Sequence, residues 1–321
     1  MLRHAPSRPI IRVLRLASIA KAQPCVTTIG AFDGVHLGHQ HVLKQVVEKA
    51  QQTGLISCVV LFEPHPKEFF QDPNKPALLR ITRLRDKIAL LQQHGIEQIL
   101  VLPFNHKLSK LSAESFVKDI LIDQLKAKHM IIGDDFHFGH QRRGNKALLE
   151  KMAPEYGFSI SDCNTFLLDA QRVSSSIVRK AIAEGNFDLA QTLLGRPYTL
   201  CGTIKKGNQL GRTIGFPTIN IGLNKPMATH GIYAVEVFGL TKNPLRGAAS
   251  VGIRPTVKEQ RRLLEVFLFD YHQECYGEYV EVQFHAKMRD EEKYDSIALL
   301  TAQIDKDVKN IQHYFTSKDK T

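Results

Sequence analysis

The stretch GAFDGVHLGHQ (residues 30–40) places His36 and His39 three residues apart, directly after the strand-like run CVTTIG. In an open α/β sheet, ligands bind at the carboxyl ends of the strands, where the N-terminus of the next helix offers free N–H groups to an anion. Both imidazoles can then donate hydrogen bonds to a phosphate whose charge grows during transfer, and Gly38 lets that phosphate approach the backbone. The stretch therefore predicts a phosphate-binding site.

Two other interpretations of this histidine pair stay open. Taken alone, a His-x-x-His pair is most often a pair of polar residues in a surface loop. A zinc site would need a third ligand, for which His41 and the distant His65 are the candidates.

A glycine-rich stretch further along, GTIKKGNQLGRTIGFPTINI (residues 202–221), contains neither a Walker A motif nor a Gly-x-Gly-x-x-Gly fingerprint. It can still fold over phosphates with its basic residues nearby, although glycines equally serve the bends of a barrel. Its glycines are Gly202, Gly207, Gly211 and Gly215, and its basic residues are Lys205, Lys206 and Arg212.

Two strand-like segments of the second half carry oxygen-bearing side chains. Thr218 and Asn220 are two residues apart, so they project from one face of a strand and can offer two oxygens to a hard cation, unless that face is simply polar and outward. Glu265 lies in the apolar segment LLEVFLFDY and shares its face with Phe267 and Phe269. Alternation alone does not decide whether that face meets solvent, but a carboxylate sheltered by two phenylalanines would suit a general base.

The composition bounds the class of protein. With 321 residues, 43% of them hydrophobic, the chain is long enough for two domains. Its net charge of +11 favours anionic partners such as nucleotides, nucleic acid or an acidic membrane surface. Five scattered cysteines without CxxC spacing indicate a reducing compartment, and no apolar run is long enough to span a bilayer, so we expect a cytoplasmic protein. The basic residues 1–24 superficially resemble a transit peptide, but the alternation in IIRVLRLA better fits an edge strand or a short helix.

The pattern of expected strands and helices, which must position these residues, changes along the chain. Up to about residue 186, β-branched runs alternate with amphipathic stretches, which predicts a doubly wound, Rossmann-like α/β domain. Beyond it, strands follow one another without helices, which predicts a small six-stranded β-barrel with a helix over residues 296–315 packed on it. The strands expected in the first domain are CVTTIG, ISCVVLF, EQILVLP, HMIIGD and FSISDC, and its helices are residues 40–52, 83–94 and 113–126, the last capped by Ser112, followed by IVRKAIAEG and FDLAQTLLG. The strands expected in the barrel are YTLCGTI, FPTINI, GIYAVEVFG, GAASVGI, LLEVFLFDY and YVEVQFHAK.

TIGAFDGVHLGHQ resembles the N-terminal signature of the bacterial bifunctional riboflavin kinase/FAD synthetases, which carry the His-x-Gly-His element of the nucleotidylyltransferase superfamily. FEPHP (residues 62–66), GDDFHFGHQRRGN (133–145) and VSSSIVR (173–179) are similar to further family segments in order and spacing, with Ser176 where the family usually has Thr. The resemblance implies that His36 and His39 contact the ATP phosphates during adenylyl transfer. It also implies ATP contacts for Gly30, Phe32, Gly38, Ser175 and Arg179, and flavin contacts for Phe62, Pro64, Asp135, Phe136, Phe138 and Arg142. Taken alone, SSSIVR would be an ordinary helix start with a basic first turn.

Six segments of the second half are similar to successive blocks of the riboflavin kinase module: GFPTINI, GIYAVEV, SVGIRPTV, LLEVFLFDY, YGEYVEVQF and KMRDEEKYDS. This likeness implies that Thr218 and Asn220 bind Mg²⁺ with ATP, and that Glu265 takes the proton from the riboflavin 5′-hydroxyl. It further implies ATP contacts for Gly202, Lys206, Gly211 and Gly215 and a flavin or phosphate contact for Arg289. The sequence departs from the family at Lys258, Glu259 and Gln260, which replace an Asn/Gly-type turn, at Phe267, a site often His, and at Tyr294, a site usually Phe.

The resemblance spans residues 27–307 and implies a bifunctional enzyme that phosphorylates riboflavin to FMN and adenylylates FMN to FAD. We expect an FMN adenylyltransferase domain over residues 1–186 and a riboflavin kinase domain over 187–321, which use Mg²⁺ and ATP and bind riboflavin, FMN and FAD but neither nucleic acid nor membrane. One alternative is a nucleotidylyltransferase with another acceptor and a non-catalytic barrel, against which Glu265, Thr218 and Asn220 argue. Another is a basic RNA-binding protein, although the segment 191–321 carries only +4 of the net charge of +11. No oligomeric state is predicted.

Overall fold

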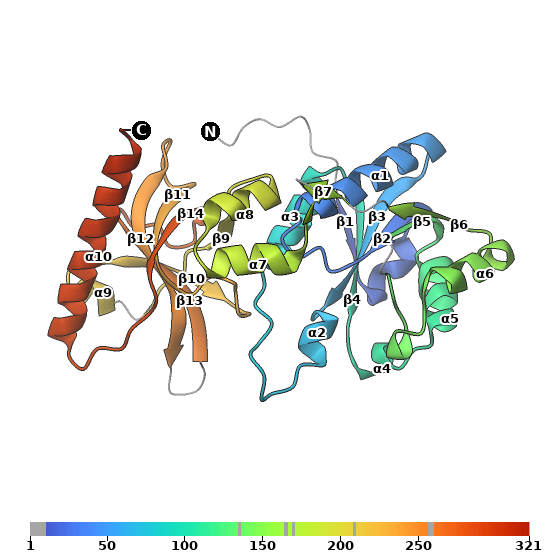
Figure 1. Ribbon diagram of the computed structural model, residues 1–321, viewed down its shortest axis with the longest axis horizontal. Helices are drawn as coiled ribbons and strands as arrows, with labels where there is room; N and C mark the ends of the chain where they lie inside the picture. Colours follow the sequence, from blue (N-terminus) through green and yellow to red (C-terminus); the bar gives the residue numbers. More distant parts are fainter. Residues whose placement is uncertain are drawn as a thin grey trace. The chain divides into compact units, whose positions relative to one another are not determined.

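The computed structural model describes residues 11–133, 136–163, 166–168, 171–207, 210–255 and 260–320. They form two compact units, each built around its own sheet (Figure 1). The first unit holds the described residues up to Leu78 together with Leu84–Ser174, and the second holds Leu79–Arg83 together with the described residues from Ser175 onward. The predicted fold class, a Rossmann-like unit and a six-stranded barrel with a C-terminal helix, is confirmed.

Parallel strands make up the main sheet of the first unit. They are β1 (Arg12–Leu14), β2 (Cys25–Ile29), β3 (Ile56–Glu63), β4 (Gln98–Pro103), β5 (Ala127–Gly133) and β6 (Ser159–Cys163), and a separate ribbon pairs β7 (Leu167–Leu168) with β8 (Gln171–Arg172). The order in the sheet is β1-β4-β3-β2-β5-β6, so the chain moves outward from β2 and then returns to place β5 on its other side. In open α/β sheets, ligands bind at such a reversal, outside the carboxyl ends of the strands.

Helical segments fill the crossovers of the first unit. They are η1 (Leu16–Lys21), α1 (Leu37–Thr53), α2 (Pro66–Phe69), α3 (Leu84–Gln93), α4 (His106–Ser109), α5 (Ala113–Ser115), η2 (Phe116–Gln124), η3 (His140–Arg142) and α6 (Lys146–Tyr156). The cap predicted at Ser112 is confirmed, because its side chain accepts the N–H of Ser115. Helix α1 begins three residues before the predicted start at residue 40. The ring of His36 caps it, and histidine is not among the usual cap residues.

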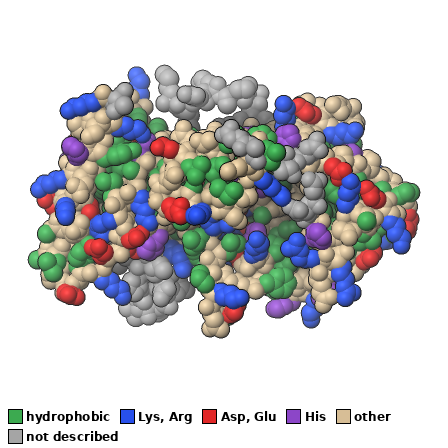
Figure 2. All heavy atoms as spheres, in the orientation of Figure 1, with side chains coloured by type: hydrophobic (Ala, Val, Ile, Leu, Met, Phe, Trp, Pro, Cys, Tyr) green, Lys and Arg blue, Asp and Glu red, His purple; other side chains and the backbone are tan. Residues whose placement is uncertain are grey.

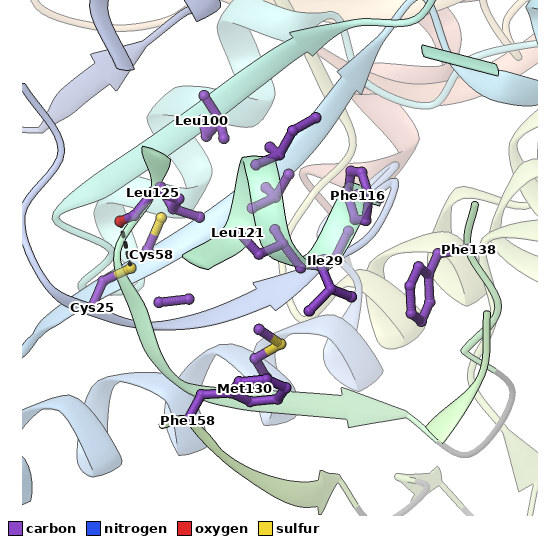
Figure 3. Packing of buried hydrophobic residues seen from close by; sticks show 14 of the residues in the cluster. Cys25, Ile29, Cys58, Leu100, Phe116, Leu121, Leu125, Met130, Phe138 and Phe158 are labelled. Atoms are coloured by element: carbon purple, nitrogen blue, oxygen red, sulfur yellow. Dashed lines mark hydrogen bonds between the residues drawn. The ribbon is translucent and has the colours of Figure 1, made fainter. Parts of the chain in front are cut away.

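Both faces of the parallel sheet are buried. Successive strand residues point to opposite faces, so Cys25 and Cys58 pack toward η2 and α6 while Val26 and Val59 pack toward α1 and α3. Figure 3 shows the first of these layers, in which Leu125 at the end of η2 lies against the two cysteines. A sheet covered on both faces in this way leaves its strand ends as the place for a ligand.

Antiparallel strands form the barrel of the second unit. They are β9 (Thr199–Thr203), β10 (Thr218–Leu223), β11 (Gly231–Phe238), β12 (Leu245–Pro255), β13 (Gln260–Leu268) and β14 (Tyr279–Arg289), in the order β10-β13-β12-β11-β14-β9. The main-chain N–H of Lys205, just beyond β9, donates to the carbonyl of Asn220 at 2.8 Å. The two edge strands therefore meet, and the barrel is nearly closed.

Helix α10 (Ile297–Lys318) covers the outer face of the barrel, and Ser296 caps it. Leu264 and Val266 of β13 are fully buried on the inner side, whereas Glu265 and Phe267 are half-buried on the side that faces α10. The remaining helices of this unit are α7 (Ser175–Ala183), α8 (Phe187–Leu194) and α9 (Leu210–Thr213). Side chains of β13 thus alternate between an apolar barrel interior and an outer face that α10 shelters. Glu265 lies on the outer face, which the sequence alone did not decide.

Charged side chains of both signs are exposed on the surface of the protein (Figure 2). Figure 2 shows Lys and Arg side chains interspersed with Asp and Glu on the face drawn, so the positive excess is not gathered there into one stripe. All five cysteines are free, and four of them are buried. In the described part of the chain, no helix combines the length and apolarity needed to cross a membrane.

Candidate active sites

The loop that joins β2 to α1 has an unusual backbone. Phe32, Gly34 and Val35 have φ angles of 46°, 85° and 44°, in the left-handed region. Residues other than glycine adopt it at a cost of about 1–3 kcal/mol and keep it only where the surroundings hold them. Gly30 is required because a Cβ there would lie 2.9 Å from the ring of Phe32. The loop turns sharply at the carboxyl end of β2, and strained backbone of this kind clusters at functional sites.

His36 and His39 lie together at the start of α1. Nδ1 of His36 accepts the main-chain N–H of His39 at 3.3 Å, and the two rings stack with centroids 3.7 Å apart. Because Nδ1 accepts, the neutral ring of His36 carries its proton on Nε2. A Cβ on Gly38 would lie 3.2 Å from the ring of His36, so this glycine makes room for an imidazole. The contact of Gly38 with a phosphate, expected from the sequence, stays a prediction.

The side chain of His39 is half-buried, and its ring is neutral at neutral pH. Burial, then the neighbouring His36 and the charge of Lys87, hold the pKa of His39 well below its usual value. Its Nδ1 has no hydrogen-bond partner in the described structure, although buried polar atoms nearly always have one. A polar ligand atom at this strand end would supply the missing partner.

Three further side chains, those of His65, Lys87 and Asp33, affect the charge distribution around these rings. His65, which follows β3, has its pKa lowered to about 4, first by burial and then by Lys87, while Asp33 acts in the opposite direction. Lys87 and Asp33 are only 7% and 6% exposed. The sequence predicted no role for either of these two residues. The described residues contain no group of three or more His, Cys, Asp or Glu that could hold a metal ion, so the zinc interpretation has no ligand set among them.

Three of the six predicted flavin contacts of the first unit are aromatic. Phe62, at the end of β3, meets Phe104 edge-on at 5.7 Å, and Phe136 stacks on Phe138 at 5.2 Å. Phe138 is 7% exposed and packs within the core, so it has a structural role whatever it binds. Pro64 follows β3 directly, Arg142 is exposed on η3, and Asp135 lies outside the described residues.

Ser175 and Arg179, the other predicted ATP contacts, belong to the second unit. Ser175 is the first residue of α7, and Nε of Arg179 donates to the carbonyl of Leu79. Their contact with the ATP phosphates stays a prediction.

A cavity of about 470 Å³ lies in the second unit between the outer face of the barrel and α10. Its volume is in the range of small-molecule sites, about 300–1,000 Å³. It brings together six residues that the sequence assigned to the kinase reaction: Lys206, Gly211, Thr218, Asn220, Glu265 and Arg289.

Strand register sets the central part of this cavity. Asn220 of β10 pairs with Glu265 of β13, which pairs with Ser250 of β12. Ser250 pairs in turn with Ile232 of β11, and Ile232 with Arg289 of β14. These five residues, which we call the catalytic row, run across five strands and all line the cavity. The row places the candidate base directly beside one of the two candidate metal ligands.

Two of the glycines predicted to contact ATP, Gly202 and Gly215, are not among the described residues that line this cavity. A Cβ on Gly202 would overlap the side chain of Ile221, so this glycine lets β9 approach β10. Gly215 has a φ angle of 87° just after α9, and a Cβ there would meet no atom within 4 Å. Gly202 therefore supports the alternative in which glycines serve the bends of a barrel, and the predicted ATP contacts of both stay predictions.

Arg289 is fixed by α10. Its Nη2 lies 2.6 Å from Oδ2 of Asp307, and its Nε lies 3.0 Å from Oδ1. Asp307 is 5% exposed and also accepts a hydrogen bond from Gln303. This pairing raises the pKa of Arg289. The guanidinium thus joins the catalytic row to α10, which the sequence did not predict.

We expect Asp307→Ala to lower the free energy of unfolding by about 3–5 kcal/mol, because it leaves Arg289 in a sheltered place without its carboxylate. Asp305→Ala is the matched control, since Asp305 pairs with Lys309 on the exposed side of the same helix and should cost less than about 1 kcal/mol. Urea unfolding followed by circular dichroism measures both. Equal small losses would contradict the structural role of Asp307.

Comparison with known proteins covers both units. The family model described as FAD synthetase matches residues 18–177, and the one described as riboflavin kinase matches residues 194–315. The bifunctional riboflavin kinase/FMN adenylyltransferase of Haemophilus influenzae is 44% identical over 92% of this chain and 96% of its own length. The protein of that name from Escherichia coli is 41% identical over 95% and 97%. Among solved structures, a chain described as a macrolide-efflux protein from Streptococcus pneumoniae superimposes with a TM-score of 0.72 at 29% identity, over 92% of this chain and 97% of its own.

The two sets of motifs, the two folds that carry them and the similarity over nearly the whole length lead to one conclusion. The chain belongs to the bifunctional riboflavin kinase/FMN adenylyltransferase family and has both activities.

Proposed function

We propose that the cavity of the second unit is the kinase site and that Glu265 is its general base. As the 5′-hydroxyl oxygen of riboflavin forms its bond to the γ-phosphorus of ATP, Glu265 takes the hydroxyl proton, the bond from that phosphorus to the β–γ bridging oxygen breaks, and ADP leaves. An alcohol needs such a base because it is not ionised at neutral pH. The observation that carries the proposal is the catalytic row, in which Glu265 stands beside Asn220 on a sheltered face.

Thr218 and Asn220 are the residues that would hold Mg²⁺. Both line the cavity from β10, and hydroxyl and amide oxygens suit a hard cation. Nδ2 of Asn220 donates to the carbonyl of Thr218 at 3.2 Å, which leaves its Oδ1 as the ligand atom. When bound, the ion would neutralise charge on the ATP phosphates.

The adenylyl-transfer site lies, by this proposal, at the carboxyl ends of β2 and β3. A phosphate oxygen of FMN attacks the α-phosphorus of a second ATP, the bond to the α–β bridging oxygen breaks, and pyrophosphate leaves. No base is needed because the attacking phosphate is already ionised. The chain has to position the phosphates and stabilise their charge, which we assign to the imidazole of His36 and to the unpartnered Nδ1 of His39.

We further propose that these reactions take place in the cytoplasm. ATP is supplied there, and the free state of all five cysteines suits a reducing compartment. The partners by this proposal are riboflavin, FMN, FAD and ATP.

Purified protein incubated with riboflavin, ATP and Mg²⁺ should yield FMN first and FAD later, measured by chromatography with flavin fluorescence. Omission of Mg²⁺ with EDTA present should stop both products. Supply of FMN in place of riboflavin should yield FAD alone. If FMN and FAD form at undiminished rates with EDTA, the metal assignment is wrong, and if neither forms with Mg²⁺, the proposed activity is wrong.

A further inference from the structure

Lys87 is a buried cation in a place that the known motifs do not explain. On α3 it stands three residues after Leu84 and four before Leu91, so it lies on the apolar face of the helix, and it is 7% exposed. Lysine is almost never this buried unless it is paired, because an ammonium group loses its hydration on burial. Its partners therefore indicate what it does.

The first partner is the strained loop between β2 and α1. Nζ of Lys87 donates to the carbonyl of Ala31 at 2.6 Å, directly before Phe32 with its left-handed backbone. A charged donor makes a stronger hydrogen bond than a neutral one. Lys87 thus ties α3 to the loop that ends at His36.

The second set of partners is electrostatic. Burial is the main cause that lowers the pKa of His39 on α1 and of His65 in the segment after β3, and the charge of Lys87 lowers both further, for His39 after the effect of His36. Both rings are therefore neutral at neutral pH. The other charged groups that face His65 are Asp33 in the loop and Lys67 and Glu68 of α2. His36 stacks on His39 from the loop side.

Neutrality matters for the geometry of this site. His36 caps α1 through an unprotonated Nδ1, and a proton on His39 would place a charge on a ring whose centroid is 3.7 Å from that of His36. The ammonium group of Lys87 places one fixed positive charge near the bound phosphates, while both histidine rings stay unprotonated.

We propose that Lys87 is a positioning residue of the adenylyl-transfer site, which anchors the loop at Ala31 and supplies the fixed positive charge that acts on His39 and His65. This inference rests on the proposed assignment of His36 and His39 to the ATP phosphates. It adds a residue from α3, about 50 positions beyond the histidine motif, to the groups that the reaction needs.

The test uses Lys87→Met and Lys87→Arg in the full-length protein. Lys87→Met should lower the rate of FAD formation from FMN about 100-fold, because the loop loses its anchor, and leave FMN formation from riboflavin at the wild-type rate. Lys44→Met is the matched control. Lys44 is an exposed residue of α1 that pairs with Glu48, and its loss removes the same charge from the same unit.

The pH dependence separates this role from a purely structural one. Without the cation, the pKa of His39 and of His65 should rise toward the usual value of about 6.5, so that the acid limb of FAD formation moves to higher pH in Lys87→Met. Lys87→Arg, which keeps a positive charge, should leave the acid limb in place. Titration of the imidazole signals by NMR, without substrate, should show the same difference between the two variants.

Three outcomes would overturn the inference: FAD formation at the wild-type rate in Lys87→Met, an acid limb and imidazole titrations that do not move in that variant, or an acid limb in Lys87→Arg that moves as far as predicted for Lys87→Met. If Lys87→Met does not fold, the Lys87→Arg result decides. The imidazole titrations do not depend on which group binds ATP, so they test Lys87 even where histidine variants refute the assignment of His36 and His39.

Discussion

Glu265→Gln should strongly reduce the rate at which FMN forms from riboflavin, while FAD still forms from supplied FMN at the wild-type rate. Glutamine keeps the size and one oxygen of the side chain but cannot take a proton, so the riboflavin hydroxyl loses its base. General-base catalysis contributes about 100- to 10,000-fold, and we expect the kinase rate to fall within that range. The measurement is the initial rate of each product from its own substrate, followed by chromatography.

Because each activity is assayed from its own substrate, FAD formation by this variant serves as the control for its folding. FAD formation at the wild-type rate shows that the chain is intact, and Glu281→Gln controls for the loss of a barrel carboxylate, because Glu281 is exposed on β14. Kinase activity retained in Glu265→Gln would remove Glu265 from the role of base. Loss of kinase activity in Glu281→Gln would show that the effect is not specific to the catalytic row.

The complementary result is expected of a His36→Ala/His39→Ala double variant, which should convert riboflavin to FMN and stop there. It removes the N–H of His36 and the buried nitrogen of His39, both of which we assign to the phosphates. Loss of a single donor to developing charge typically costs about 100- to 1,000-fold in rate. Accumulated FMN with no FAD after prolonged incubation with ATP is the expected readout.

His36→Asn separates the cap of α1 from the chemistry. Asparagine is among the best cap residues, whereas alanine costs the helix about 1 kcal/mol at this position. The asparagine variant should therefore keep the stability of the first unit and still make FAD slowly. If it makes FAD at the wild-type rate, the imidazole of His36 has only a structural role.

Much of the fold follows from periodicity. Runs such as ISCVVLF are too short and too β-branched for helices, and the switch to consecutive strands from β9 onward predicts the barrel, as the structure confirms. Ser112 and Ser296 are ordinary cap residues, so the starts of α5 and α10 can be predicted from the sequence. The start of α1 is not, because the cap is a histidine whose ring works only when its Nδ1 is unprotonated.

The sites follow from the sequence in part. The motifs contain the histidines, Thr218, Asn220 and Glu265, but spacing along one strand does not fix which residue of another strand stands opposite. The pairing of Asn220 with Glu265, and of Arg289 with Asp307, depends on tertiary structure. Lys87 was missed for the same reason, although one signal was present: a lysine on the apolar face of an amphipathic helix.

The catalytic row limits which insertions, deletions and substitutions the kinase unit can accept without loss of activity. Side chains of a strand alternate between faces, so insertion or deletion of one residue within β13 would turn Glu265 toward the barrel interior and bring an apolar neighbour opposite Asn220. Substitutions on the solvent side of the same strands leave this alignment intact. We therefore expect the six strands to keep a fixed length between their turns in active enzymes, and changes in chain length to be confined to the turns.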